Sequence, residues 1–130
     1  TGSWRSLCSL PALWTGLLYD DTALDAAAEL VRDWSAEERA YLRAEVPRAA
    51  LGTPFRRGTV GDIAREVVAI AKAGLKARAR IDWDGQDETR YLARLEQIAA
   101  DGRTPAEETL GRFHEAWGGK VDPLFREYAF

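Results

Sequence analysis

An all-α fold in a single domain is predicted for this chain of 130 residues. Apolar residues recur at helical spacing along the chain, and residues that cap helices precede most of these stretches. No segment alternates apolar and polar residues between turn signals, as a half-buried strand would. With 46% hydrophobic and 30% charged residues, the composition is typical of a globular domain long enough to bury a core.

The first helix is expected in the most apolar stretch, "WRSLCSLPALWTGLLYDD", residues 4–21. It has one early basic residue and no small-residue cleavage site, which disfavours a secretory signal. Its apolar run is too short to span a bilayer. We therefore expect a core helix over residues 10–19, buried on more than one side. The chain contains no methionine, and we expect Thr1 to be an internal position of a longer protein.

The second and third helices are expected on either side of a capping box. A helical stripe runs from Leu24 to Trp34. Ser35 and Glu38 then have the spacing at which each side chain binds the other residue's backbone N–H. The helix that follows should end before Pro47, because proline disfavours helical backbone at the preceding residue. Residues 51–59, "LGTPFRRGT", are predicted to be a loop.

The later helices are predicted from their starts. Thr59 should begin the longest one, in which Gly74 costs about 1 kcal/mol relative to alanine. Asp87 should cap the next helix. Thr104 and Asp122 each precede a proline, which is favoured at the first helical position, and the Thr104 helix should continue to Trp117. The prediction is about five to six helices in all.

Few residues suggest catalysis. Cys8 is the one cysteine and His114 the one histidine, so neither an internal disulfide nor a metal site built from cysteine or histidine is possible. No phosphate-binding or dinucleotide-binding glycine motif is present. Pairs of acidic residues lie at predicted helix starts, where the helix dipole accounts for them. We expect no metal site within this chain.

One basic segment, residues 56–80, suggests a binding role. It holds seven basic residues against two acidic ones: Arg56, Arg57, Arg65, Lys72, Lys76, Arg78 and Arg80 against Asp62 and Glu66. A basic helix can contact nucleic-acid phosphates. A solvated face near a helix C-terminus is the favoured interpretation. The net charge of −3 likewise favours neither a nucleic acid nor a membrane as partner.

Several collinear blocks resemble plant-type glutamate–cysteine ligases. The opening stretch is similar to the family's W-R-R-L-C-x-L-P-A-F-W-V-G-L-L-Y-D. "DWSAEERAYLRAEVP" resembles D-W-[ST]-x-x-E-R-x-x-L-R-x-x-V-P, and "LGTPFRRGTV" resembles L-K-T-P-F-R-x-G. "RTPAEETL" and "AWGGKVDPLFREYAF" are similar to T-P-A-E-x-L-L and E-W-G-x-S-V-D-P-V-F. The alanine- and arginine-rich composition looks like the family's proteobacterial branch.

This resemblance implies that residues 1–130 are the helical C-terminal region of a larger cytoplasmic α+β enzyme, of the glutamine-synthetase-like carboxylate–amine ligases. The family joins the γ-carboxylate of glutamate to the amine of cysteine, the first step of glutathione biosynthesis. ATP and Mg²⁺ activate the carboxylate as a γ-glutamyl phosphate. The implied partners are glutamate, cysteine and ATP, together with the enzyme's own upstream part. The catalytic and metal-binding residues are expected on an upstream sheet, so this chain alone should be inactive.

Three residues match family positions near the pocket rim. Trp4 and Arg5 follow the place where the family carries catalytic machinery. For Trp4, packing is favoured over lining of the substrate pocket. Ser6 replaces a second arginine there, which weakens the case for a paired-arginine clamp. Arg56 matches the T-P-F-R block, where hydrogen bonds that brace the loop through backbone carbonyls are favoured over a ligand contact.

Two alternatives stay open. One is a carboxylate–amine ligase with another acceptor amine, because the residues that select cysteine would lie upstream. The other is a stand-alone helical domain that binds nucleic acid or acts as a scaffold through residues 56–80.

Overall fold

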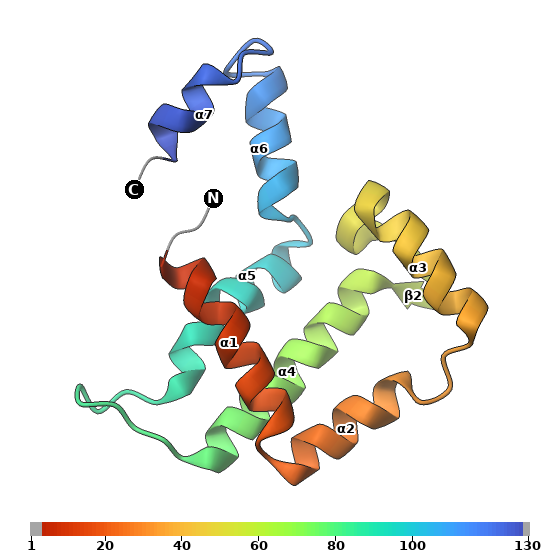
Figure 1. Ribbon diagram of the computed structural model, residues 1–130, viewed down its shortest axis with the longest axis vertical. Coiled ribbons are helices and arrows are strands. Elements are labelled where there is room, and N and C mark those ends of the chain that lie inside the picture. The colour runs from red at the N-terminus through yellow and green to blue at the C-terminus, as the bar shows by residue number, and fades with distance from the viewer. Residues whose placement is uncertain (1–3, 129–130) are drawn as a thin grey trace.

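The longest helix, α4 (Val60–Arg78), is the element on which the other helices pack. The structure is a computed structural model that describes the backbone of residues 4–128 and the side chains of residues 6–128. Beside α4 lie α1 (Trp4–Leu18), α2 (Asp21–Val31) and α5 (Ala93–Asp101) (Figure 1). The predicted all-α class is confirmed.

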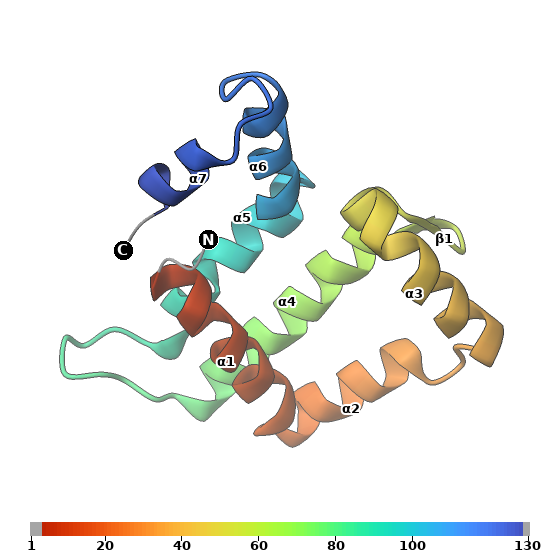
Figure 2. The ribbon, with the colours of Figure 1, turned by 45° about the horizontal axis from the view of Figure 1, so that its top comes forward.

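The remaining elements extend from this central group in two directions. On one side are α3 (Ala36–Ala49), the 3₁₀ turn η1 (Ala50–Gly52), β1 (Pro54–Phe55) and β2 (Gly58–Thr59). On the other are α6 (Pro105–His114) and α7 (Asp122–Glu127), whereas the 3₁₀ turn η2 (Glu88–Leu92) belongs to the central group, in contact with α1, α4 and α5. Figure 2 shows α3 and the strands at one end of α4, and α6 and α7 beyond α5. The described residues thus form seven α-helices, compared with the five to six expected.

The hydrophobic core lies where α1, α4 and η2 meet. Its buried members are Ala12 and Leu17 from α1, Ala71 and Leu75 from α4, and Leu92 from η2. Leu75 and Leu92 are almost completely inaccessible to solvent. Two of these five residues come from α1, and the other three lie more than 50 residues further along the chain, so the burial of α1 depends on α4 and η2.

Small residues allow α1 and α4 to cross in direct backbone contact. A Cβ atom placed on Gly74 would lie 1.9 Å from the carbonyl oxygen of Gly16. One placed on Gly16 would lie 2.2 Å from the carbonyl oxygen of Ala71. Neither position can accept a side chain unless the helices separate, because real Cβ contacts are longer than about 3 Å.

Capping residues begin several helices as predicted. In the box at the start of α3, the Glu38 N–H donates to Ser35 Oγ at 3.1 Å and the Ser35 N–H donates to Glu38 Oε2 at 2.9 Å. Thr104 and Glu107 make the same reciprocal pair at the start of α6. The cap of α2 is Asp20, whose side chain accepts a hydrogen bond from the Ala23 N–H at 2.9 Å.

The prediction that the third helix ends before Pro47 is wrong. α3 continues to Ala49 with Pro47 in its last turn. A proline at that point removes only one backbone hydrogen bond, and its exposed ring has room at the helix end. Pro11 likewise lies within α1.

Two predicted helix ends are also wrong, and both involve tryptophan. α2 ends at Val31 and α6 at His114, so Trp34 and Trp117 lie beyond their helices. Trp34 meets the ring of Phe55 edge to face, with 5.0 Å between ring centroids. Trp117 is buried, and its indole N–H donates to Glu127 Oε1 at 2.9 Å. The contacts that these two rings make with distant residues, rather than their helical spacing, determine where they lie.

A short hairpin occupies the predicted loop. Pro54 pairs with Thr59, and Phe55 with Gly58, so residues 56 and 57 form the turn. Strands of two residues are too short to show the alternating pattern by which strands are predicted.

Candidate functional site

The three predicted rim residues lie in two separate places. Trp4 and Arg5 form the first turn of α1, but their side chains lie outside the part of the chain whose side chains are described. Arg56 lies in the turn of the β1–β2 hairpin. The start of α1 lies near α7, whereas the hairpin lies near α3, so the structure does not bring them together (Figures 1 and 2). The rim assignment stays a prediction.

Arg56 has a left-handed backbone, with φ of 52°. This conformation costs a residue with a side chain roughly 1–2 kcal/mol. It directs the guanidinium away from the hairpin toward the start of α3. The cost is offset by the contacts that the side chain makes there.

The Arg56 guanidinium binds two carboxylates. Its Nε and Nη2 donate to the two oxygens of Glu38 at 2.7 and 2.9 Å, a bidentate pair. Its Nη1 donates to both oxygens of Asp33 at 2.9 and 3.1 Å, and Nη2 also donates to the Asp33 backbone carbonyl at 3.0 Å. These contacts join the hairpin to the α2–α3 connection and to the first turn of α3. The predicted brace thus consists mainly of carboxylates, with a single backbone carbonyl.

Glu38 therefore has two structural roles, because it is also the capping-box residue of α3. Hydrogen bonds from Arg56 and then from the Ser35 backbone lower the pKa of Glu38 from 4.5 to about 2. The same contacts raise the pKa of Arg56, with Glu38 the larger cause and Asp33 the second. Both groups are therefore charged at neutral pH.

A shallow groove of about 450 Å³ lies beside this cluster. Its lining consists of Glu37, Glu38, Tyr41, Pro54, Phe55 and Arg56. The Tyr41 hydroxyl donates to the Pro54 carbonyl at 3.0 Å, which holds the hairpin against α3. Because the donors of Arg56 are directed at carboxylates of its own chain, an anion in the groove would have to displace Glu38 or Asp33. The cluster is built to hold the hairpin.

Four of the seven basic residues in the 56–80 segment are paired. Besides Arg56, Lys72 donates to Glu96 at 2.6 Å, and Arg78 donates to Glu88 at 3.1 Å while lying over the Tyr19 ring. Arg65 pairs with Asp62 and donates to the Ala99 carbonyl at 3.0 Å. Most of these carboxylates come from outside residues 56–80. The spacing of residues in the sequence therefore could not predict that the basic side chains are paired. The local positive charge is thereby reduced.

The described residues contain no group of three or more histidine, cysteine, aspartate or glutamate side chains that could hold an ion. Cys8 is half-buried and unbonded. No helix in the described part is long and apolar enough to cross a bilayer.

Comparisons with known proteins give a consistent result. The family model described as "Glutamate-cysteine ligase family 2 (GCS2)" matches residues 1–127. The chain is 43% identical over 129 residues to chloroplastic glutamate–cysteine ligases of Nicotiana tabacum and Arabidopsis thaliana. It is 41% identical to glutamate–cysteine ligase B of Oryza sativa subsp. japonica, also chloroplastic. Each alignment covers 99% of this chain but only 24–25% of the relative. The chain spans about a quarter of the length of these relatives.

Proposed function

Because the chain belongs to glutamate–cysteine ligase family 2, we propose that it is the helical C-terminal part of an enzyme that joins the γ-carboxylate of glutamate to the amine of cysteine. The observation that carries the proposal is the collinear likeness over 129 residues, at 43% identity, to proteins named glutamate–cysteine ligase. Formation of γ-glutamylcysteine is the first step of glutathione biosynthesis.

Two observations support a place for Mg²⁺ and the nucleotide outside the described residues. These residues offer no group of acidic or histidine ligands suited to an ion. The best-placed guanidinium, that of Arg56, already binds Glu38 and Asp33. We therefore propose that ATP, Mg²⁺ and both amino-acid substrates are bound mainly by a part of the protein outside these residues.

The proposed role of residues 1–130 is that of one structural unit beside the catalytic part. The contacts of Arg56 support a bracing role for that residue. For Trp4 and Arg5, the proposed place on the pocket rim rests on the family resemblance alone. An Arg5→Ala variant of the longer enzyme should retain its stability and lose turnover.

A proteobacterial source and a cytoplasmic location are finer proposals. The support for the source is compositional, since the chain has 22 alanines, and 15 arginines against three lysines. The location rests on the family resemblance alone. The relatives named above are plant chloroplastic proteins, and their location is a property of those proteins.

The function is tested by comparing two proteins in one assay with ATP, glutamate and cysteine. The protein expressed from the complete reading frame should form γ-glutamylcysteine, whereas the 130-residue chain should give no more than a no-protein control. Product from the 130-residue chain would contradict the proposed division of roles. A longer protein that turns over faster with another amine than with cysteine would favour the ligase with a different acceptor.

A further inference from the structure

Helix α1 packs Ala12 and Leu17 into the core and leaves a row of large apolar residues exposed on its opposite face. The face against α4 includes Ser9, Ala12 and Gly16, all of them buried. The opposite face carries Leu7, Leu10, Trp14 and Leu18, which are 60%, 58%, 53% and 50% exposed. These four positions follow a helical repeat and form one continuous stripe, here called the outer stripe.

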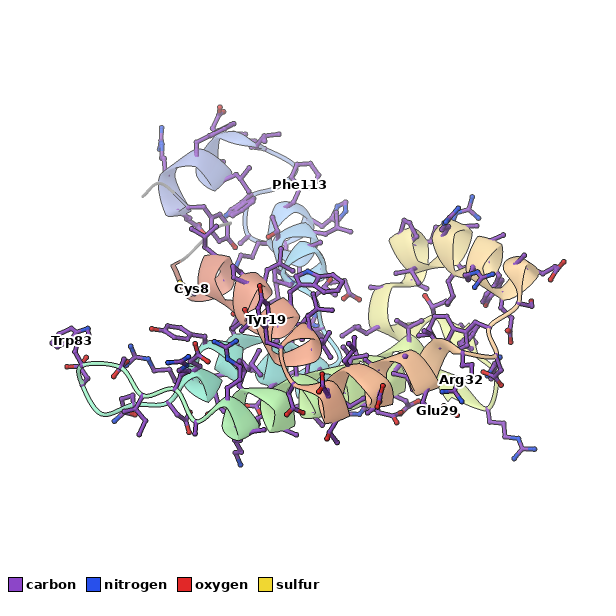
Figure 3. All side chains as sticks on the ribbon, turned by 60° about the horizontal axis from the view of Figure 1, so that its bottom comes forward. Cys8, Tyr19, Glu29, Arg32, Trp83 and Phe113 are labelled. Carbon is purple, nitrogen blue, oxygen red and sulfur yellow. The ribbon has the colours of Figure 1, made fainter. Side chains whose placement is uncertain are left out.

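The close crossing keeps the outer stripe outside. Rotating α1 to bury it would replace Gly16 at the crossing by a residue with a side chain. The backbones of the two helices touch at Gly16 and Gly74, so a side chain in place of Gly16 would not fit. In Figure 3 the helix between Cys8 and Tyr19 runs across the outside of the molecule, with no other element in front of it. A contiguous apolar surface of this kind usually marks an interface.

The charges around the outer stripe define what can cover it. Residues 6–19 contain no charged side chain. The next charged positions are acidic (Asp20, Asp21, Asp25 and Glu29), and no lysine or arginine occurs between Arg5 and Arg32. A nucleic acid or an anionic membrane surface would require unpaired basic residues here, and Arg78, which lies over the Tyr19 ring, is already paired with Glu88. The covering surface must therefore be apolar and uncharged, as the interior of a protein is.

We propose that the outer stripe is covered by the part of the longer ligase that lies outside these 130 residues. This inference rests on the proposed function, because it requires a longer enzyme. The relatives are about four times as long as this chain, so ample protein is present to cover a surface that the described helices leave open. The stripe then forms a buried seam inside one polypeptide.

The test uses thiol labelling of the protein expressed from the complete reading frame. Leu10→Cys places a thiol on the outer stripe, and Arg39→Cys places one on an exposed position of α3. Both are made in a Cys8→Ser background, and labelling is quantified on the peptide that carries each new cysteine. If the stripe is covered, Cys at position 10 should label at least about tenfold more slowly than Cys at position 39, and equally fast after unfolding in guanidinium.

Three outcomes are informative. Equal native labelling rates at the two positions would overturn the proposal. Protection that is lost when the protein is diluted 100-fold would show that a second copy covers the stripe, and would also overturn it. Protection that is independent of concentration supports it. Ligase activity measured on the Arg39→Cys protein tests the proposed function separately, since an inactive protein with a protected position 10 would refute the function alone.

Discussion

Arg56 joins three elements through one side chain. Its guanidinium links the hairpin turn to Asp33 before α3 and to Glu38 in the first turn of α3. Arg57, its neighbour in the same turn, takes part in no ion pair within the described part of the chain. The two adjacent arginines therefore provide a matched comparison.

Replacing Arg56 should raise the pKa of Glu38. The Arg56→Gln variant removes the largest cause of the lowered value, and the pKa should move from about 2 toward 4.5. The Ser35 backbone N–H remains, so part of the lowering should persist. A carbon-detected NMR titration of Glu38 measures the change. Arg57→Gln serves as the control, and an equal shift in that variant would contradict the assignment of cause.

Acid should destabilise the protein through the same residue. The folded-state pKa of Glu38 lies below its ordinary value, so its contribution to stability is fully present above about pH 4.5. It is lost as the pH falls toward 2, because protonation removes the contact with Arg56. The capping carboxylates Asp62 and Glu107 also have lowered pKa values and act in the same direction. Urea unfolding at several pH values should show that the free energy of unfolding falls more steeply below pH 4.5 in the unaltered protein than in the Arg56→Gln variant.

Part of this cluster was predictable from the sequence. The Ser35–Glu38 box follows from spacing alone, since its two residues lie in one helical turn. The pairing of Arg56 with Glu38 and Asp33 did not follow, because these residues are 18 and 23 positions away and only the fold brings them together.

At the scale of elements, Gly74 shows the limit of helix propensity. Propensity alone makes Gly74 a mild weakness that alanine would repair. The structure instead places Gly74 against the Gly16 carbonyl, where α1 and α4 touch. Gly111 in α6 is a contrasting case, because no atom lies within 4 Å of the position that its Cβ would take.

Two glycine-to-alanine changes should therefore have opposite effects. Gly74→Ala should lower the free energy of unfolding by about 1–3 kcal/mol or more, because the added methyl group forces α1 and α4 apart. Gly111→Ala should raise it by up to about 1 kcal/mol, because only helix propensity is at stake. Equilibrium denaturation in urea measures both. A stabilising Gly74→Ala would contradict the close crossing.

Helix starts were predicted better than helix ends. Starts depend on local capping chemistry, which the sequence shows directly. The ends of α2 and α6 depend on where Trp34 and Trp117 find partners, Phe55 in one case and Glu127 in the other. The segment after Asp122 forms a helix as expected, although Asp122 is its first residue rather than its cap.

At the scale of the whole molecule, many basic side chains form ion pairs with carboxylates of other elements. The basic excess of residues 56–80 is offset by carboxylates of α3, η2 and α5. The protein should therefore bind duplex DNA or RNA no more tightly than about 1 μM at physiological salt. Fluorescence anisotropy with labelled duplexes at several salt concentrations measures this. Tighter binding that weakens steeply as salt rises would favour the nucleic-acid-binding alternative.

Trp14 should contribute differently to the short and the long protein. In the 130-residue chain its side chain is half exposed, so Trp14→Ala should cost less than a core substitution. In the longer enzyme, where Trp14 is covered, Trp14→Ala should lower the free energy of unfolding by about 3–5 kcal/mol, the usual range for replacing a buried tryptophan by alanine. Thermal and urea unfolding of both proteins give the comparison. An equally small loss in both would remove the expectation that this helix is buried on more than one side.

The close crossing of α1 and α4 also affects the protein while it is being made. Gly16 leaves the ribosome before Gly74, with about 60 residues between them, and translation at about 5–20 residues per second separates the two by several seconds. During this interval α1 lacks α4, the helix against which its inner face packs. Slow synthesis between the two glycines therefore prolongs the exposure of an aggregation-prone segment, and chaperone demand should be greatest there.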